Sequence, residues 1–147
     1  MNKKSNNRHI FFILIAISIF ALDRITKSLF TKEFCIFPFC IKPSINFGAA
    51  FGIFPNMQLL LILISIIIFL IVVFILISRE FRGSRLLQYA MILIIAGTLG
   101  NLADRIFYGY VIDWLTFSFV KFSSFNLADV SNFTGALLLL IEIFKKK

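Results

Sequence analysis

The chain has 147 residues, of which 60% are hydrophobic and 20 are phenylalanine, and its formal net charge is +8. A soluble domain of this size would expose large apolar patches with such a composition, whereas lipid tails accept the same surface at little cost. The charge does not indicate a nucleic-acid-binding protein, since the basic residues fall in short clusters between apolar runs. The composition predicts an integral membrane protein that forms a single domain over residues 1–147.

Four apolar segments are candidates for transmembrane helices, at about residues 10–30, 57–78, 86–103 and 129–144. The second segment holds 22 residues without a charge. That length gives roughly 33 Å of helix, which matches a hydrocarbon core of about 30 Å. The first segment has the basic start of a secretory signal peptide, but it continues into charged residues without a small-residue cleavage site. We therefore expect it to be retained as the first span.

The two longer connections differ in composition. Residues 31–56 contain three prolines and short apolar stretches, which predicts a small element of strands and turns. Residues 106–128 interleave aromatic residues with serine and lysine, which predicts an amphipathic segment at the membrane interface that is too polar to span.

The basic residues predict the orientation, because Lys and Arg are enriched in cytoplasmic loops. One side of the predicted bundle carries nine cations against two glutamates, in the two terminal segments and residues 79–85. The other side carries six cations and five acids. We therefore expect both termini in the cytoplasm and residues 31–56 and 106–128 on the extracytoplasmic side.

Three aspartates are predicted to lie in one layer of the membrane. Counted along helices from the cytoplasmic basic residues, Asp23, Asp104 and Asp129 lie at about 22 to 28 Å, near the outer hydrocarbon boundary. Carboxylates at this depth need a partner, a proton or water, so they indicate a functional site. For two of them a structural explanation has equal weight, since Asp23 with Lys27 and Asp104 with Arg105 can form interfacial ion pairs.

Asp113 and Asp129 differ from the other acids because neither has a basic residue within four positions. Asp113 follows a short connection and can return to the same layer. If the two carboxyl groups meet, one holds a proton while the other stays a base. Such a pair can activate water against an amide and protonate the leaving nitrogen. Buried, hydrogen-bonded structural aspartates are the alternative.

Other catalytic systems find little support in the sequence. The only histidine, His9, lies at the predicted cytoplasmic end, so a Ser/His/Asp triad cannot form beside the aspartates. No zinc-peptidase or phosphate-loop motif occurs, and we expect neither a metal site nor an organic cofactor. Three asparagines, Asn46, Asn101 and Asn126, either orient the carboxylates and a bound peptide or, as Asn126 suggests, cap helices.

Five motifs in chain order closely resemble those of the bacterial lipoprotein signal peptidases, also called signal peptidase II. The motifs are Asp23-Arg24-Ile-Thr-Lys27, Asn46-Phe-Gly48-Ala-Ala-Phe-Gly, Gly100-Asn101-Leu-Ala-Asp104-Arg105, Val111-Ile-Asp113 and Phe125-Asn126-Leu-Ala128-Asp129. The resemblance implies an aspartic endopeptidase of the bacterial inner membrane. Such an enzyme removes signal peptides from prolipoproteins by cleaving on the N-terminal side of a diacylglyceryl-modified cysteine.

The resemblance also assigns residues to roles. It implies Asp113 and Asp129 as the catalytic pair at the extracytoplasmic face, and it implies inhibition by the antibiotic globomycin. The residues implied to line or support the site are Asp23, Lys27, Asn46, Gly48, Asn101, Asp104, Arg105, Asn126 and Ala128.

The expected fold is an all-α membrane protein with four transmembrane helices and a small extracytoplasmic β-sheet. The resemblance adds a short interfacial periplasmic helix within residues 106–128. Ile45 and Trp114 depart from the residues usual in the family. The sequence leaves open whether Cys35 and Cys40 form a disulfide.

Two other functions remain possible on the sequence. A small proton- or cation-coupled transporter would explain acids within the membrane, but it should carry charges through the whole depth of the bundle. A non-catalytic assembly or insertion factor would leave the four aspartates individually replaceable.

Overall fold

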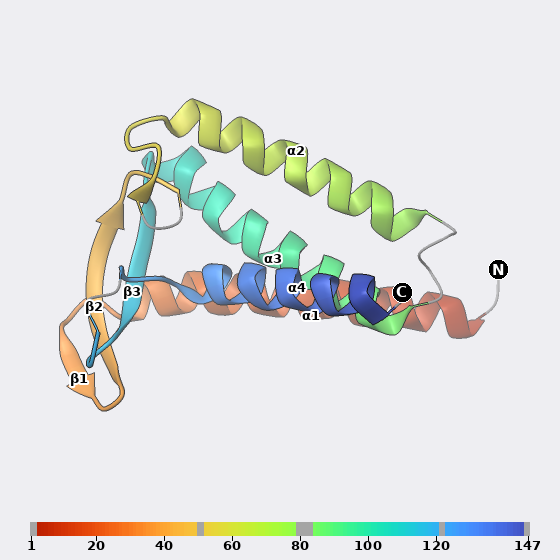
Figure 1. The fold of residues 1–147 in the computed structure, drawn as a ribbon, viewed down its shortest axis with the longest axis horizontal. Helices are drawn as coiled ribbons and strands as arrows, with labels where there is room; N and C mark the ends of the chain where they lie inside the picture. The colour runs from red at the N-terminus through yellow and green to blue at the C-terminus, as the bar shows by residue number, and fades with distance from the viewer. Residues whose placement is uncertain (1–2, 50–51, 79–83, 121–122, 146–147) are drawn as a thin grey trace.

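The computed structural model describes residues 3–49, 52–78, 84–120 and 123–145. Within these residues four helices run lengthwise beside one another, and a small sheet lies across one end of them (Figure 1). The helices are α1 (Lys3–Leu29), α2 (Gln58–Ile77), α3 (Arg85–Tyr108) and α4 (Leu127–Lys145). The first turn of α1 and the last turn of α4 lie at the end opposite the sheet (Figure 1).

Helix α3 is the centre of the bundle, because it contacts each of the other three helices. Its buried Leu87, Ala90, Met91 and Ile95 form a core cluster with Val72 of α2. The helix begins at Ser84, whose side chain accepts a hydrogen bond from the backbone N–H of Leu87. It ends at Gly109, which adopts a left-handed conformation with φ 77°. The helix thus extends beyond the predicted span of residues 86–103.

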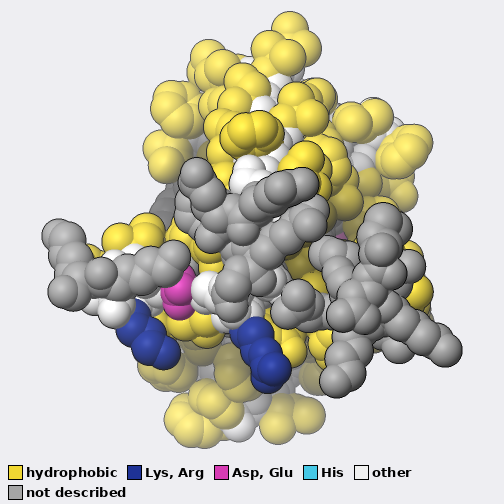
Figure 2. All heavy atoms as spheres, turned by 90° about the vertical axis from the view of Figure 1, so that its right-hand side faces the viewer, with side chains coloured by type: hydrophobic (Ala, Val, Ile, Leu, Met, Phe, Trp, Pro, Cys, Tyr) yellow, Lys and Arg dark blue, Asp and Glu magenta, His cyan; other side chains and the backbone are white. Residues whose placement is uncertain are grey.

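Three of the four helices, α2, α3 and α4, are long and apolar enough to cross a membrane. Helix α2 is uncharged throughout, and large side chains such as Leu59, Leu70 and Phe74 are exposed. Seen from the end opposite the sheet, the described surface is hydrophobic around its edge (Figure 2). Within the residues that the structure describes, helix α1 is not among these three helices, and Asp23, Arg24 and Lys27 lie in its last two turns.

The sheet has three antiparallel strands in the order β1-β2-β3. They are β1 (Phe34–Ile36), β2 (Phe39–Asn46) and β3 (Val111–Phe117). Cys35 and Cys40, which lie directly opposite each other in β1 and β2, form a disulfide. The β2–β3 register shifts between Ile41 and Ser44, where Pro43 is accommodated at the irregularity. The small sheet predicted within residues 31–56 is present and gains its third strand from residues 111–117.

The structure does not contain the predicted short helix within the described residues 109–120 and 123–126. Residues 111–117 form β3 instead, and Leu115 pairs with Phe125 along the free edge of that strand. The interleaved aromatic residues that predicted an amphipathic interfacial segment contact one another on the sheet: the ring of Phe117 lies 5.4 Å from that of Phe39 and 5.6 Å from that of Phe125. Pairing between distant segments therefore overrides the local pattern.

Candidate active site

Four aspartates from four different elements meet where the helix bundle adjoins the sheet. Asp23 lies near the end of α1, Asp104 near the end of α3, Asp113 in β3, and Asp129 in the first turn of α4. Asp23, Asp104 and Asp113 are each no more than 2% exposed, and Asp129 is half-buried. The site therefore brings four largely buried carboxyl groups together. Hydrogen-bond donors or cations must offset the cost of burying them.

Asp113 and Asp129 are joined by the buried Asn126. The side-chain amide of Asn126 donates a hydrogen bond of 2.7 Å to Asp113 Oδ1, and its backbone N–H donates one of 3.0 Å to Asp129 Oδ2. Asn126 Oδ1 in turn accepts the backbone N–H of Asp129 at 2.9 Å. This exchange is the reciprocal capping pattern of a helix start, so the residue that begins α4 also holds both acids.

Each of the two carboxylates accepts a second hydrogen bond from an asparagine. The Asn46 side-chain amide donates to Asp113 Oδ2 at 3.0 Å, and the Asn101 side-chain amide donates to Asp129 Oδ1 at 2.7 Å. Three of the predicted site residues, the three asparagines, thus touch the predicted pair directly. Amide donors favour the ionised form of a carboxylate and fix its orientation.

The protonation of Asp113 reflects its surroundings. Burial and the neighbouring negative charge of Asp129 raise the pKa of Asp113 to about 7, although the hydrogen bonds from Asn46 and Asn126 favour its ionised form. At neutral pH the pair can therefore hold one proton between two carboxyl groups, which is the state that general acid and base catalysis requires.

The other two aspartates form a compact ion-pair cluster with two cations of α1. Lys27 Nζ lies 2.9 Å from Asp23 Oδ2 and 2.7 Å from Asp104 Oδ2. The Arg24 guanidinium lies 2.7 Å from Asp23 Oδ2 and also pairs with Asp104. The interfacial ion pair of Asp23 with Lys27 is therefore present.

The suggested ion pair of Asp104 with Arg105 is wrong, because Asp104 pairs with α1. The Arg105 guanidinium instead donates to the carbonyl oxygen of Gly48 at 3.2 Å. The Asn46 side chain accepts the backbone N–H of Gly48 at 2.8 Å. A Cβ at Gly48 would lie 2.7 Å from the carbonyl oxygen of Ile53, so this tight turn leaves no room for a side chain. Arg105, Gly48 and Asn46 thus form one connected unit beside Asp113.

Asp23 and Asp104 also hold the backbone on which the other two acids stand. Asp23 Oδ1 accepts the backbone N–H of Ala128 at 3.0 Å, and Asp104 Oδ2 accepts that of Ile112 at 3.2 Å. Ala128 directly precedes Asp129 and Ile112 directly precedes Asp113. A Cβ at Gly100 would lie 2.8 Å from Ala128 Cβ and 2.9 Å from Asp23 Oδ2, so this approach depends on glycine.

A cavity of about 400 Å³ opens beside Asp113. Its lining is Ser44, Ile45, Asn46, Phe47, Gly48, Gly52, Pro55, Asp113, Ser123 and Ser124. Ser44 lies directly opposite Asp113 in the β2–β3 pairing. Arg24 and the serines that line the cavity were not among the predicted site residues. The sequence marked only Arg24, which follows Asp23 in the first motif, because the serines have no distinctive spacing.

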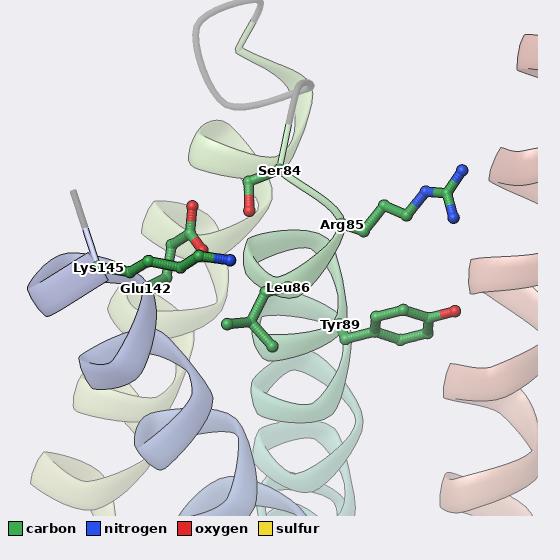
Figure 3. A pocket seen from close by; sticks show the side chains of 6 residues that line it. All are labelled: Ser84, Arg85, Leu86, Tyr89, Glu142 and Lys145. Atoms are coloured by element: carbon green, nitrogen blue, oxygen red, sulfur yellow. The ribbon is translucent and has the colours of Figure 1, made fainter.

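A larger cavity of about 600 Å³ lies at the other end of the bundle, between the start of α3 and the end of α4 (Figure 3). Leu86 points toward Glu142 and Lys145 of α4, whereas Arg85 and Tyr89 point away from α4 (Figure 3). None of the four clustered aspartates lines this cavity. The larger cavity is therefore not the candidate active site, because the clustered acids lie at the sheet end.

Known proteins resemble this chain along most of its length. The family model for signal peptidase (SPase) II matches residues 15–145. The lipoprotein signal peptidase of Clostridium tetani is 38% identical over 145 residues, covering 91% of this chain and 92% of the relative. That of Streptococcus agalactiae is 34% identical over 148 residues, covering 95% and 96%.

Solved structures share the fold of this chain. One structure of a bacterial membrane enzyme superimposes with a TM-score of 0.83 at 29% identity, covering 92% of this chain and 88% of the other. A second gives a TM-score of 0.80 at the same identity, covering 93% and 94%. The arrangement of helices and sheet is thus shared along nearly the whole chain. This chain belongs to the signal peptidase II family.

Proposed function

We propose that Asp113 and Asp129 are the catalytic pair of an aspartic endopeptidase that removes signal peptides from prolipoproteins. Cleavage takes place on the N-terminal side of a diacylglyceryl-modified cysteine. The observation that carries the assignment is that Asn126 binds both carboxyl groups, at 2.7 Å and 3.0 Å. Two acids held by one buried residue suit a reaction that needs a base and an acid on the same peptide bond.

The reaction needs one proton on the pair. The ionised carboxylate takes a proton from water as the water oxygen attacks the carbonyl carbon of the scissile peptide bond. The protonated carboxyl group then gives its proton to the leaving nitrogen as the carbon–nitrogen bond breaks. With a pKa of about 7, Asp113 suits the proton-carrying role at neutral pH, which leaves Asp129 as the base.

The remaining residues divide into two groups by what they touch. Asn46, Gly48 and Arg105 form the wall of the cavity beside Asp113 or lie against it, and we assign them to peptide binding. Asn101 and Asn126 orient the catalytic carboxylates. The residues assigned to supporting the backbone of the pair are Asp23, Lys27, Asp104 and Ala128.

The proposed location is the inner membrane, with α1 as a fourth crossing, both termini in the cytoplasm and the site at the extracytoplasmic face. The start of α1 and the end of α4 both lie at the end of the bundle opposite the sheet (Figure 1). The disulfide between Cys35 and Cys40 supports an oxidising compartment on the sheet side. A site at this depth lets the acyl chains of a lipidated substrate stay in the bilayer while the peptide bond meets water.

A transporter is not supported. The four aspartates gather in one cluster at the sheet end, and α2 carries no charge along its length, whereas a proton or cation path needs polar groups at successive depths. Peptidase inhibitors of the globomycin type are expected to compete for the cavity beside Asp113.

The test uses one precursor in two forms. The purified protein is incubated with a prolipoprotein that carries the diacylglyceryl group on its cysteine, and with the same precursor without lipid. We expect cleavage of the lipidated form alone, sensitive to globomycin. Equal cleavage of both forms, or none of either by inserted, folded protein, would contradict the proposed specificity.

A further inference from the structure

Arg24 belongs to the ion-pair cluster, yet no step of the proposed reaction uses it. Its guanidinium donates hydrogen bonds to Asp104 Oδ1, to Asp23 Oδ2 at 2.7 Å and to the carbonyl oxygen of Gly100 at 3.0 Å. The planar guanidinium therefore bridges the end of α1 to α3 through three acceptors. A geometry of this kind fixes two carboxylates relative to each other, which a point charge cannot do as well.

The two carboxylates that Arg24 joins each hold one half of the catalytic pair. Asp23 accepts the N–H of Ala128, directly before Asp129. Asp104 accepts the N–H of Ile112, directly before Asp113. A displacement of Asp23 relative to Asp104 would therefore change the separation of the two catalytic carboxyl groups.

Lys27 joins the same two carboxylates but cannot also take over the contacts of Arg24. Its Nζ atom already contacts Asp23 at 2.9 Å, Asp104 at 2.7 Å and Asn101 Oδ1 at 3.2 Å, which uses its three protons. One ammonium also leaves one of the two buried carboxylates without a compensating charge, and such a group repels its partner or takes up a proton.

The negative charges of the four aspartates are balanced by neighbouring cations only when Arg24 is included. The four aspartates with one shared proton carry three negative charges, and the cations beside them are Arg24 and Lys27 of α1 and Arg105 of α3. Helix α2 contributes no charged residue. Loss of Arg24 would leave excess negative charge beside the pair.

We propose that Arg24 is a positioning residue for the peptidase reaction, because it joins the two carboxylates that hold the peptide groups before Asp113 and Asp129. The inference rests on the proposed function, since it assumes that this pair carries out the cleavage. Arg24 does not touch the reacting atoms, and its effect is transmitted through Asp23 and Asp104.

The test compares Arg24→Gln and Arg24→Lys with the native protein, with Arg85→Gln as the matched control. Arg85 is exposed and lies at the other end of α3. For Arg24→Gln we expect kcat on the lipidated precursor to fall about 100-fold with little change in KM, as misplacement of catalytic groups produces. We also expect the pH optimum to rise by roughly one unit, because the pair loses a nearby positive charge.

Arg24→Lys keeps the charge without the bridging geometry. It should restore the pH optimum while recovering only part of kcat, and Arg85→Gln should resemble the native protein in both. A purely structural role would lower the amount of folded protein but leave the pH optimum in place. An unchanged kcat and pH optimum in folded Arg24→Gln, or in Arg24→Lys a pH optimum as shifted as in Arg24→Gln, would overturn the inference. Failure of the native protein to cleave the precursor would instead overturn the proposed function.

Discussion

The carboxylate of Asp23 accepts a hydrogen bond of 3.0 Å from the backbone N–H of Ala128, across a sequence separation of 105 residues. This contact ties the end of α1 to the first turn of α4. Asp104 makes the equivalent contact with the peptide group before Asp113, at 3.2 Å. The four aspartates thus form two pairs: Asp23 and Asp104 accept hydrogen bonds from the backbone, and Asp113 and Asp129 are joined through Asn126.

The glycine at position 100 should be needed for the contact of Asp23 with Ala128. In Gly100→Ala the added methyl group would lie 2.8 Å from Ala128 Cβ, so the helices must separate. We expect a loss of about 1 to 3 kcal/mol in stability and a fall in kcat of at least about tenfold. Thermal unfolding and cleavage assays on the purified variant measure the two effects.

Gly135→Ala is the control for this prediction. Its added methyl group would lie 2.7 Å from a side-chain carbon of Ile94, so it meets a similar obstruction away from the acids. It should lower stability without a specific loss of kcat in the folded fraction. If both variants lose kcat in proportion to stability, Gly100 has no particular role at the site.

The pH profile should depend on Asn46. Its amide stabilises the ionised form of Asp113, so Asn46→Ala should raise the pKa of Asp113 above its native value of about 7. Asp113 would then keep its proton to higher pH, and the alkaline limb of kcat/KM should move upward. An alkaline limb that stays in place or moves downward would show that Asp113 is not the group titrating there.

The stability of the fold should depend on pH through Asp113. Because its folded pKa of about 7 lies above the ordinary value of 3.8, its contribution to stability is complete below about pH 4 and is lost as the pH rises through 7. Asp113→Asn removes this loss, so the variant should gain stability relative to the native protein between pH 5 and pH 8. A difference in Tm that is constant over this range would contradict the assigned shift.

The orientation can be tested through the disulfide. The chain has two cysteines, Cys35 and Cys40, and both lie in the sheet. In spheroplasts treated with a mild reductant, a membrane-impermeant maleimide should label the chain. Cys35→Ser/Cys40→Ser is the unlabelled control. Labelling that requires permeabilised membranes would place the sheet, and the site with it, in the cytoplasm.

The helices could be predicted from the sequence because lipid imposes a simple rule on each segment, and the family could be predicted from its five motifs. An uncharged run must be as long as the bilayer is thick, so residues 57–78 closely matched α2 (Gln58–Ile77). The resemblance to the signal peptidase II family is confirmed by a match over residues 15–145. Helix α3 (Arg85–Tyr108) continues past the predicted span of residues 86–103, because a helix can extend beyond the hydrocarbon core of the bilayer.

Contacts between distant segments could not be predicted in the same way. Strand β3 pairs with β2 across more than sixty residues, and its local pattern fits a strand and an amphipathic helix equally well. The same limit applies to Asp104, whose partners Arg24 and Lys27 lie on another helix. Sequence spacing suggested the neighbouring Arg105, because local pairs are the only ones that spacing can show.

The central claim is that Asp113 and Asp129 share one proton and together activate water. The most direct measurement is the turnover of a lipidated precursor by purified Asp113→Asn and Asp129→Asn, with Glu33→Gln as an exposed matched control. Each of the first two changes keeps the shape of the side chain but removes its acid-base chemistry, so each should reduce kcat by at least about 100-fold. The control should retain native turnover. Near-native cleavage by either folded Asp→Asn variant would contradict the account.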